Sequence, residues 1–162
     1  CGIVQLCSDS EKKGTAAPHF IGVNKLGQEI DPLDKFKGKY IYVFFFATWN
    51  THAMSEFRYM ANLQAKYGKQ IAFVSISLDP DTNAYKAFLK ANPKYNWTIL
   101  HYDFREKTKD DYNLYSVPSG FIIDPDGNLY VSPADTPSGD LEYNLYRIAF
   151  PKAPPMLRPE DH

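Results

Sequence analysis

The residues best placed to do chemistry lie where a long apolar run gives way to a helical pattern. The segment FFFATWNTHAMSEF, residues 44–57, makes this change without a proline or glycine. Strand ends that lead directly into a helix are common places for reactive and binding groups in α/β proteins. The helix is expected to open with Asn50, Thr51, His52 and Ala53. Asn50 is a favoured N-cap residue, because its amide oxygen accepts a hydrogen bond from a free backbone N–H of the first turn.

The histidines give little sign of catalysis or metal binding. His52 lies at the expected helix start, but no Ser, Cys or acid stands at triad spacing from it, so we interpret it as an exposed first-turn residue. His19, His52 and His101 fall on separate expected elements, and a metal site would require them to converge with a carboxylate. The sequence therefore predicts neither a metal nor another cofactor.

Cys1 and Cys7 are the two cysteines of the chain, too few and too terminal for a disulfide framework or a zinc site. Three interpretations of them stay open. They pair with each other, or Cys1 is the lipid-bearing first residue of a mature lipoprotein, or both simply begin a fragment. Cys1 followed by Gly2 is compatible with lipoprotein processing.

Length and charge limit the possible partners. The 162 residues suit one ordinary domain, and 18 basic against 19 acidic side chains leave no basic stripe for a phosphate backbone. We therefore expect no nucleic-acid partner. The longest apolar stretch, Tyr40 to Ala47, is far shorter than the ~20 residues of a membrane span, so no span is expected.

Strand and helix patterns alternate along most of the chain. The expected elements are a hairpin over 21–30, a buried strand over 40–47, a helix over 51–67, a strand over 71–78, a helix starting at 79–81, a strand over 97–100, a short helix over 107–114, a hairpin turned at 125–127, and a helix over 140–148. This order predicts an α/β fold, with a central mixed β-sheet and helices on both faces.

Several separated motifs carry a resemblance to a known family. FFFATWNTHAMSEF resembles the active-site segment of thioredoxin-fold thiol-disulfide oxidoreductases of the TlpA and ResA type, related to AhpC/TSA proteins, in which an apolar strand ends in Trp-Cys-x-x-Cys. GTAAPHF, KFKGKYIYVFF, VSISLD and YNLYSVPSGFIIDPDGNL are similar to further landmarks of that family in the same order. The resemblance implies a thioredoxin-like three-layer sandwich over residues 14–150, with a leader or linker at 1–13 and a proline-rich tail at 151–162.

The resemblance places Asn50 at the position of the nucleophilic cysteine and Ala53 at that of the resolving cysteine. Neither residue can form or exchange a disulfide, because exchange needs a thiolate to attack sulfur. Phe44 lies six residues before Asn50, where many thioredoxins keep a buried carboxylate that moves protons, and an apolar ring cannot do so. The resemblance thus implies a degenerate redox site.

Other parts of the family site are matched. Pro118, between Val117 and Ser119, matches the cis-proline that faces the active site, with the Val117–Pro118 bond expected to be cis and to face Trp49 and Asn50. Glu56 matches an acid that tunes thiol pKa values in TlpA-like and ResA-like proteins. With no thiol nearby, we interpret Glu56 instead as a charge in the first turn of its helix.

Two classes of function are left open. The first is a redox-inactive binding or structural module that holds an extended peptide or protein partner in the groove of Trp49, Thr51, His52, Val117, Pro118 and Ser119. The second is a thiol oxidoreductase that uses Cys1, Cys7 or cysteines of a partner. A peroxiredoxin-like activity is less favoured, because it also needs a cysteine at the helix start. The resemblance implies a periplasmic or cell-envelope location, with a possible lipid anchor on Cys1.

Overall fold

The computed structural model describes residues 14–102, 118–154 and 156. Its helices and strands are β1 (Gly22–Val23), β2 (Glu29–Ile30), α2 (Pro32–Lys35), β3 (Tyr40–Phe46), α3 (Thr51–Tyr67), β4 (Ile71–Ser77), α4 (Thr82–Ala91), β5 (Thr98–Tyr102), β6 (Ser119–Ile123), β7 (Leu129–Ala134) and α6 (Leu141–Ala149). Strands and helices alternate from β2 to β5, and the described elements begin with two strands.

The strands form one mixed sheet in the order β2-β1-β5-β4-β3-β6-β7. The strands β3, β4 and β5 are parallel neighbours, joined by crossovers that contain α3 and α4. The two hairpins, β1–β2 and β6–β7, add antiparallel strands to the two sides of this parallel centre. The chain therefore leaves β3 at the middle of the sheet and enters α3 directly, as the sequence predicts.

Strand β3 is buried on both faces, and its side chains alternate between two cores. Ile41, Val43 and Phe45 belong to one cluster, which receives Leu33 from α2. Tyr42, Phe44 and Phe46 alternate with them and belong to the other cluster. That second cluster also receives buried side chains from α3, α4 and α6, namely Phe57, Met60, Tyr85, Phe88, Leu141 and Leu145.

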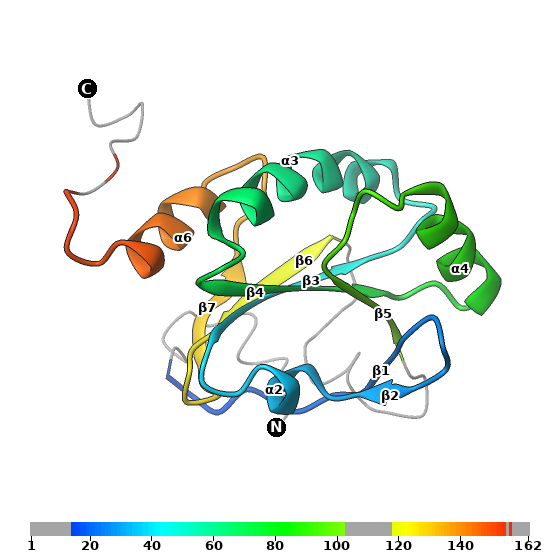
Figure 1. Ribbon diagram of the computed structural model, residues 1–162, viewed down its shortest axis with the longest axis horizontal. Helices are drawn as coiled ribbons and strands as arrows, with labels where there is room; N and C mark the ends of the chain where they lie inside the picture. The colour runs from blue at the N-terminus through cyan, green and yellow to red at the C-terminus, as the bar shows by residue number, and fades with distance from the viewer. Residues whose placement is uncertain (1–13, 103–117, 155, 157–162) are drawn as a thin grey trace.

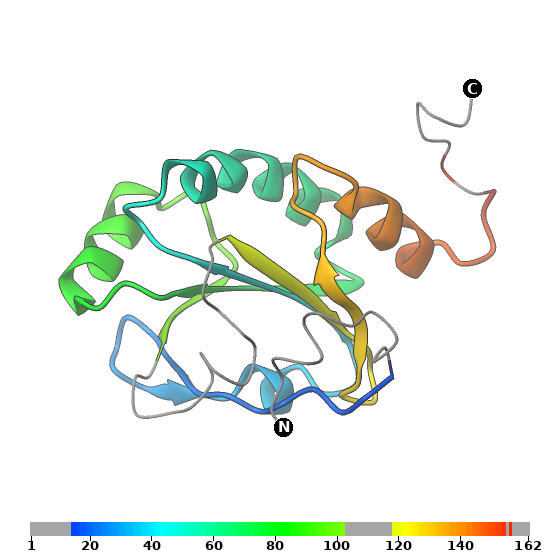
Figure 2. The ribbon, with the colours of Figure 1, turned by 180° about the vertical axis from the view of Figure 1, so that it is seen from behind.

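Helices cover both faces of the sheet, which confirms the predicted three-layer arrangement. Figures 1 and 2 show α3, α4 and α6 together on one face and α2 on the opposite face, beside the β1–β2 hairpin. Helix α3 runs across the middle of its layer, and α4 and α6 flank it. The start of α3 consequently lies at the end of the sheet where β3 finishes.

The predicted elements match the structure closely, and the differences are local. Helix α2 was not predicted, because it is a single turn of four residues, set by Asp31, whose carboxylate accepts hydrogen bonds from the backbone N–H groups of Leu33 and Asp34. The helix predicted over 107–114 lies outside the described residues. Within the described part of the chain, no helix is both long and apolar enough to span a membrane.

Candidate functional site

Asn50 caps helix α3, which confirms the prediction from its residue type. Its backbone is extended, with φ −94° and ψ 111°, and its side-chain oxygen accepts a hydrogen bond from the backbone N–H of Ala53 at 2.9 Å. Its carbonyl oxygen accepts the first bond of the helix, from the N–H of Met54 at 3.1 Å. One of the free N–H groups of this helix terminus is thus occupied by the protein's own amide.

The exposed residues of the helix start surround this cap. Trp49 is a large hydrophobic side chain that is 69% exposed, and Thr51 and His52 are exposed beside it, while Ala53 is fully buried beneath. An exposed tryptophan is unusual, because its large apolar surface gains from burial. These three side chains form an accessible surface at the end of β3.

Strand β6 brings two further predicted residues toward the same end of the sheet. The antiparallel register places Ser119 opposite Phe45, four residues before Trp49 in the chain. Pro118 directly precedes Ser119, and both are partly buried. Val117 lies outside the described residues, so the predicted cis Val117–Pro118 bond stays a prediction. Among the described residues, the cis peptide bond is Ser132–Pro133.

Glu56 differs from its sequence interpretation. It lies in the second turn of α3, not in the first, and is 2% exposed. Its carboxylate accepts two hydrogen bonds from Ser138, one from the backbone N–H at 2.8 Å and one from the hydroxyl at 2.6 Å. The interpretation as a charge in the first turn was wrong: Glu56 lies one turn further along α3, where the loop before α6 folds over it and supplies both donors.

His52 joins the same cluster from the solvent side. Its Nε2 lies 3.3 Å from a carboxylate oxygen of Glu56, one helical turn further along α3, and its side chain is 61% exposed. The carboxylate of Glu56 lies between the other two groups: it contacts Ser138 on one side and His52 on the other. A nucleophilic triad requires the histidine in the middle, next to the hydroxyl. The cluster can therefore hold the loop on the helix but lacks the arrangement that activates a serine.

A second buried carboxylate, that of Asp79, accepts hydrogen bonds from the segment between β3 and α3. The sequence analysis did not predict this role. Asp79 is 2% exposed and accepts hydrogen bonds from the backbone N–H and the hydroxyl of Thr48, at 3.0 and 2.8 Å. The hydroxyl of Ser77 also donates to it, at 2.5 Å. The sequence predicts a helix start at 79–81, and within that range the cap of α4 is Asp81, which leaves Asp79 free for these contacts. An acid directly after a buried strand, beside the end of its parallel neighbour, was the available signal.

Phe44 is apolar and buried, as the sequence implies. It is 1% exposed and packs against the rings of Tyr42, Phe46 and Phe57. Among the described residues, two buried carboxylates lie near the helix start: Glu56, on α3, and Asp79, which accepts hydrogen bonds from Thr48.

His19, His52 and His101, the histidines among the described residues, do not converge. His19 Nδ1 contacts Asp31 at 2.7 Å, His52 contacts Glu56, and His101 Nε2 contacts the backbone oxygen of Asp79 at 2.6 Å. Among the described residues, the one group with ligand atoms close enough to share a metal ion is His19, Asp31 and Asp34. Asp31 is already used as the cap of α2 and as the partner of His19.

A family model described as "Thioredoxin-like" matches residues 38–129, more than half of the chain. The chain belongs to the thioredoxin-like family. Among the curated relatives, the ResA thiol-disulfide oxidoreductases of Bacillus cereus and Bacillus subtilis are 31% and 28% identical to it over 126 and 122 residues. Each match covers 75% of this chain, and 70% and 66% of the respective relative. The matches make the chain a member of the ResA and TlpA type within the thioredoxin-like family.

Solved structures agree with this assignment. A crystal structure of a candidate thiol-disulfide oxidoreductase from Bacteroides vulgatus superposes with a TM-score of 0.77 at 28% identity, and the match covers 86% of this chain and 99% of that one. A thiol:disulfide interchange protein from a Bacteroides species superposes with a TM-score of 0.74 at 20% identity, over 85% of this chain and 90% of that one, and supports the thioredoxin-like fold alone.

Proposed function

We propose that this ResA-type domain has no dithiol chemistry at the start of α3 and serves as a binding module. The observation that carries the proposal is the cap of Asn50 on the N–H of Ala53. In thiol chemistry at a helix start, such free N–H groups and the helix dipole stabilise a thiolate. Here the amide oxygen of Asn50 accepts from this N–H in place of a thiolate. Neither Asn50 nor Ala53 can attack sulfur.

The binding surface in this proposal is formed by the exposed Trp49, Thr51 and His52 together with Pro118 and Ser119. The occupant is an extended segment of a peptide or protein, which pairs through its backbone and places a side chain against Trp49. Trp49 is 69% exposed, which supports this surface, because covering its large apolar side chain with a partner lowers the free energy.

The proposal places the domain in the periplasm or elsewhere in the cell envelope. It rests on the membership in the ResA type. The alternative is an oxidoreductase that uses Cys1, Cys7 or the cysteines of a partner. Both cysteines lie outside the described residues, so no described contact favours this alternative.

The binding of an unfolded protein without free thiols tests the proposed surface. Reduced and carboxymethylated lactalbumin offers extended segments without reactive sulfur, and its fluorescence anisotropy after labelling reports binding. We expect saturable binding to the wild type and at least a ten-fold weaker affinity for Trp49→Ala. Trp49 is exposed, so this substitution leaves the fold intact.

Tyr59→Ala is the matched control, because Tyr59, on α3, is another exposed aromatic residue, 42% exposed. It is expected to bind like the wild type. Equal losses in the two variants would contradict the proposed surface, and so would the absence of binding to the wild type.

A further inference from the structure

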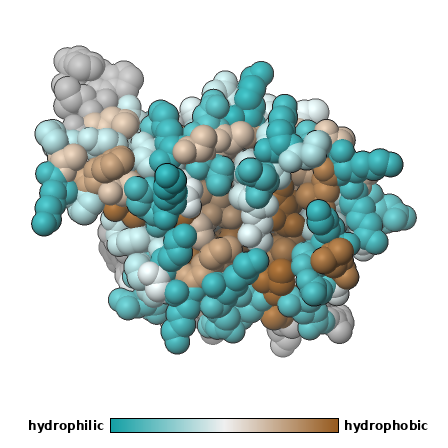
Figure 3. All heavy atoms as spheres, viewed as in Figure 1, coloured by the Kyte–Doolittle hydropathy of each residue, from teal (hydrophilic) through white to brown (hydrophobic). Residues whose placement is uncertain are grey.

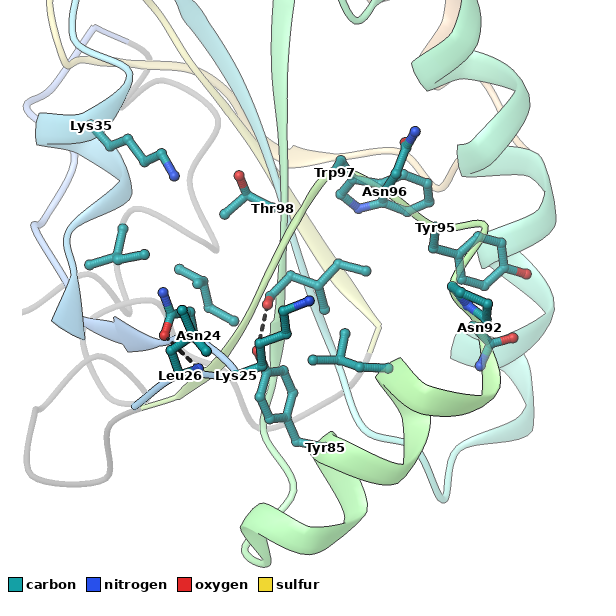
Figure 4. Close-up of a pocket in the computed structure, with 15 residues that line it drawn as sticks. Asn24, Lys25, Leu26, Lys35, Tyr85, Asn92, Tyr95, Asn96, Trp97 and Thr98 are labelled. Carbon is teal, nitrogen blue, oxygen red and sulfur yellow. Dashed lines mark hydrogen bonds between the residues drawn. The ribbon is translucent and has the colours of Figure 1, made fainter. Parts of the chain in front are cut away.

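A pocket of about 470 Å³ lies away from the start of α3. It is bounded by the β1–β2 hairpin and α2 on one side and by α4 and the segment that follows α4 on the other, with β5 at its floor (Figure 4). Its volume falls in the range of about 300–1,000 Å³ that is typical of small-molecule sites. None of its described lining residues belongs to the proposed peptide surface.

Among the described residues, no strand pairs with Thr98, Ile99 or Leu100 on the side of β5 that faces the pocket. On one side, β5 pairs with β4 from Thr98 to His101. On the other side, β1 pairs only with His101 and Tyr102. The hydroxyl of Tyr85, from α4, donates a hydrogen bond to the backbone oxygen of Ile99 at 2.6 Å. This contact occupies a backbone acceptor of β5 within the stretch that β1 leaves unpaired.

The charged side chains in the described lining of the pocket are all positive. Its described lining contains two cations, Lys25 from the hairpin and Lys35 from α2, and no acid. Neither lysine makes an ion pair with a described residue, although the ammonium of Lys35 lies 5.5 Å from the ring centroid of Phe36. In Figure 4, Lys35 extends from α2 toward Thr98. The chain as a whole carries a formal charge of −1, so this local excess of positive charge is a property of the pocket.

Flat and apolar surfaces complete the lining. Trp97 is fixed by a hydrogen bond from its Nε1 to the hydroxyl of Ser75 at 2.9 Å, and its ring lies 5.4 Å from that of Tyr95. Leu26, at the hairpin, is 74% exposed. Figure 3 shows hydrophobic side chains gathered between α4 and this hairpin. Fixed rings and two cations in the lining of one pocket suit a ligand that has both an apolar body and a negative charge.

We propose that this pocket binds a small organic anion with a flat apolar body. The acidic group contacts Lys25 and Lys35, and the body packs against Trp97 and Leu26. Tyr85 remains a neutral donor to Ile99 while the ligand binds, since burial raises the pKa of Tyr85 to about 12. The short, partly covered edge of β5 favours a small molecule over an acidic peptide that would add as a strand.

Two probes of equal shape and different charge test this site. Isothermal titration calorimetry of the whole chain with 2-naphthoate is expected to give saturable binding. Its neutral analogue 2-naphthamide is expected to bind at least ten-fold more weakly. Equal affinities for the two probes, or no binding of naphthoate at millimolar concentration, would overturn the proposal.

Substitutions then locate the binding. The double variant Lys25→Met and Lys35→Met keeps two exposed side chains of similar length without charge, and should weaken naphthoate binding at least ten-fold and remove its preference over the amide. Lys69→Met, an exposed lysine outside the pocket, is the matched control and should bind like the wild type. An unchanged affinity in the double variant would refute the site. Tighter binding of an acidic hexapeptide than of naphthoate, lost in the same double variant, would refute the small-molecule assignment.

Discussion

Asn50 stabilises the start of α3 through the hydrogen bond that its side chain accepts from Ala53. Asn50→Ala should lower the free energy of unfolding by about 1 kcal/mol, within the 0.5–2 kcal/mol range typical of N-caps. Urea denaturation followed by circular dichroism measures the loss. Asn50→Asp keeps an acceptor at the same place and should stay within a few tenths of a kcal/mol of the wild type. If Asn50→Ala leaves the midpoint unchanged, the amide has a role other than capping.

Tyr42 and Tyr85 are both buried, and they differ in their hydroxyl groups. The hydroxyl of Tyr42 has no hydrogen-bond partner among the described residues, whereas that of Tyr85 donates to Ile99. Removing an unsatisfied buried hydroxyl relieves a desolvation penalty, and removing a bonded one loses about 1 kcal/mol. Tyr42→Phe should therefore be neutral or stabilising, and Tyr85→Phe should destabilise by about 1 kcal/mol, measured by urea denaturation. A clear loss in Tyr42→Phe would show that its hydroxyl has a partner.

At the scale of elements, Glu56 connects α3 to the loop that precedes α6. Glu56→Ala should destabilise by about 2–3 kcal/mol, because it leaves the N–H and hydroxyl of Ser138 without their acceptor. Ser138→Ala removes only the hydroxyl donor and should cost about 1 kcal/mol. Thermal or urea unfolding measures both losses. Ser55→Ala, at an exposed position on the same helix, is the control and should change stability by less than about 0.5 kcal/mol.

Alkaline pH should weaken the packing of the helices through their buried tyrosines. Burial raises the pKa of Tyr85 to about 12, and burial with a hydrogen bond to Glu142 raises that of Tyr67 as well. An unfolded tyrosine ionises near pH 10. The stabilisation from these neutral phenols is therefore complete below about pH 10 and is lost as pH rises through the folded-state pKa.

Tyr85→Phe tests this dependence. Urea unfolding at a series of pH values should show that stability falls more slowly between pH 10 and 12 in this variant than in the wild type. Parallel curves for the two proteins would contradict the assignment of Tyr85 as a contributor to alkaline unfolding.

Periodicity predicted the regular elements well. The helix predicted over 51–67 has those bounds in the structure, and the strands predicted over 40–47 and 71–78 differ from β3 and β4 by one residue at one end. The roles of Glu56 and Asp79 were not predictable in the same way. Their partners, Ser138 and Thr48, stand 82 and 31 residues away in the chain, so only the tertiary fold brings them together.

At the scale of the whole molecule, the thioredoxin-like sheet is built without using a cysteine in any described element. The apolar clusters on the two faces of β3 supply the core. Membership in the ResA type follows from the match over most of the chain. The proposed function separates fold from redox chemistry, because such chemistry depends on a few side chains at one strand end.

Insulin reduction with dithiothreitol as the electron source tests the central claim most directly. The wild type and the double variant Cys1→Ser, Cys7→Ser are expected to add nothing to the rate with dithiothreitol alone. Asn50→Cys with Ala53→Cys should form an intramolecular disulfide across the first turn of α3 and reduce insulin above that background. Turnover by the wild type that is lost in the Cys1 and Cys7 variant would contradict the account, because it would make the protein a thiol oxidoreductase that uses those two cysteines.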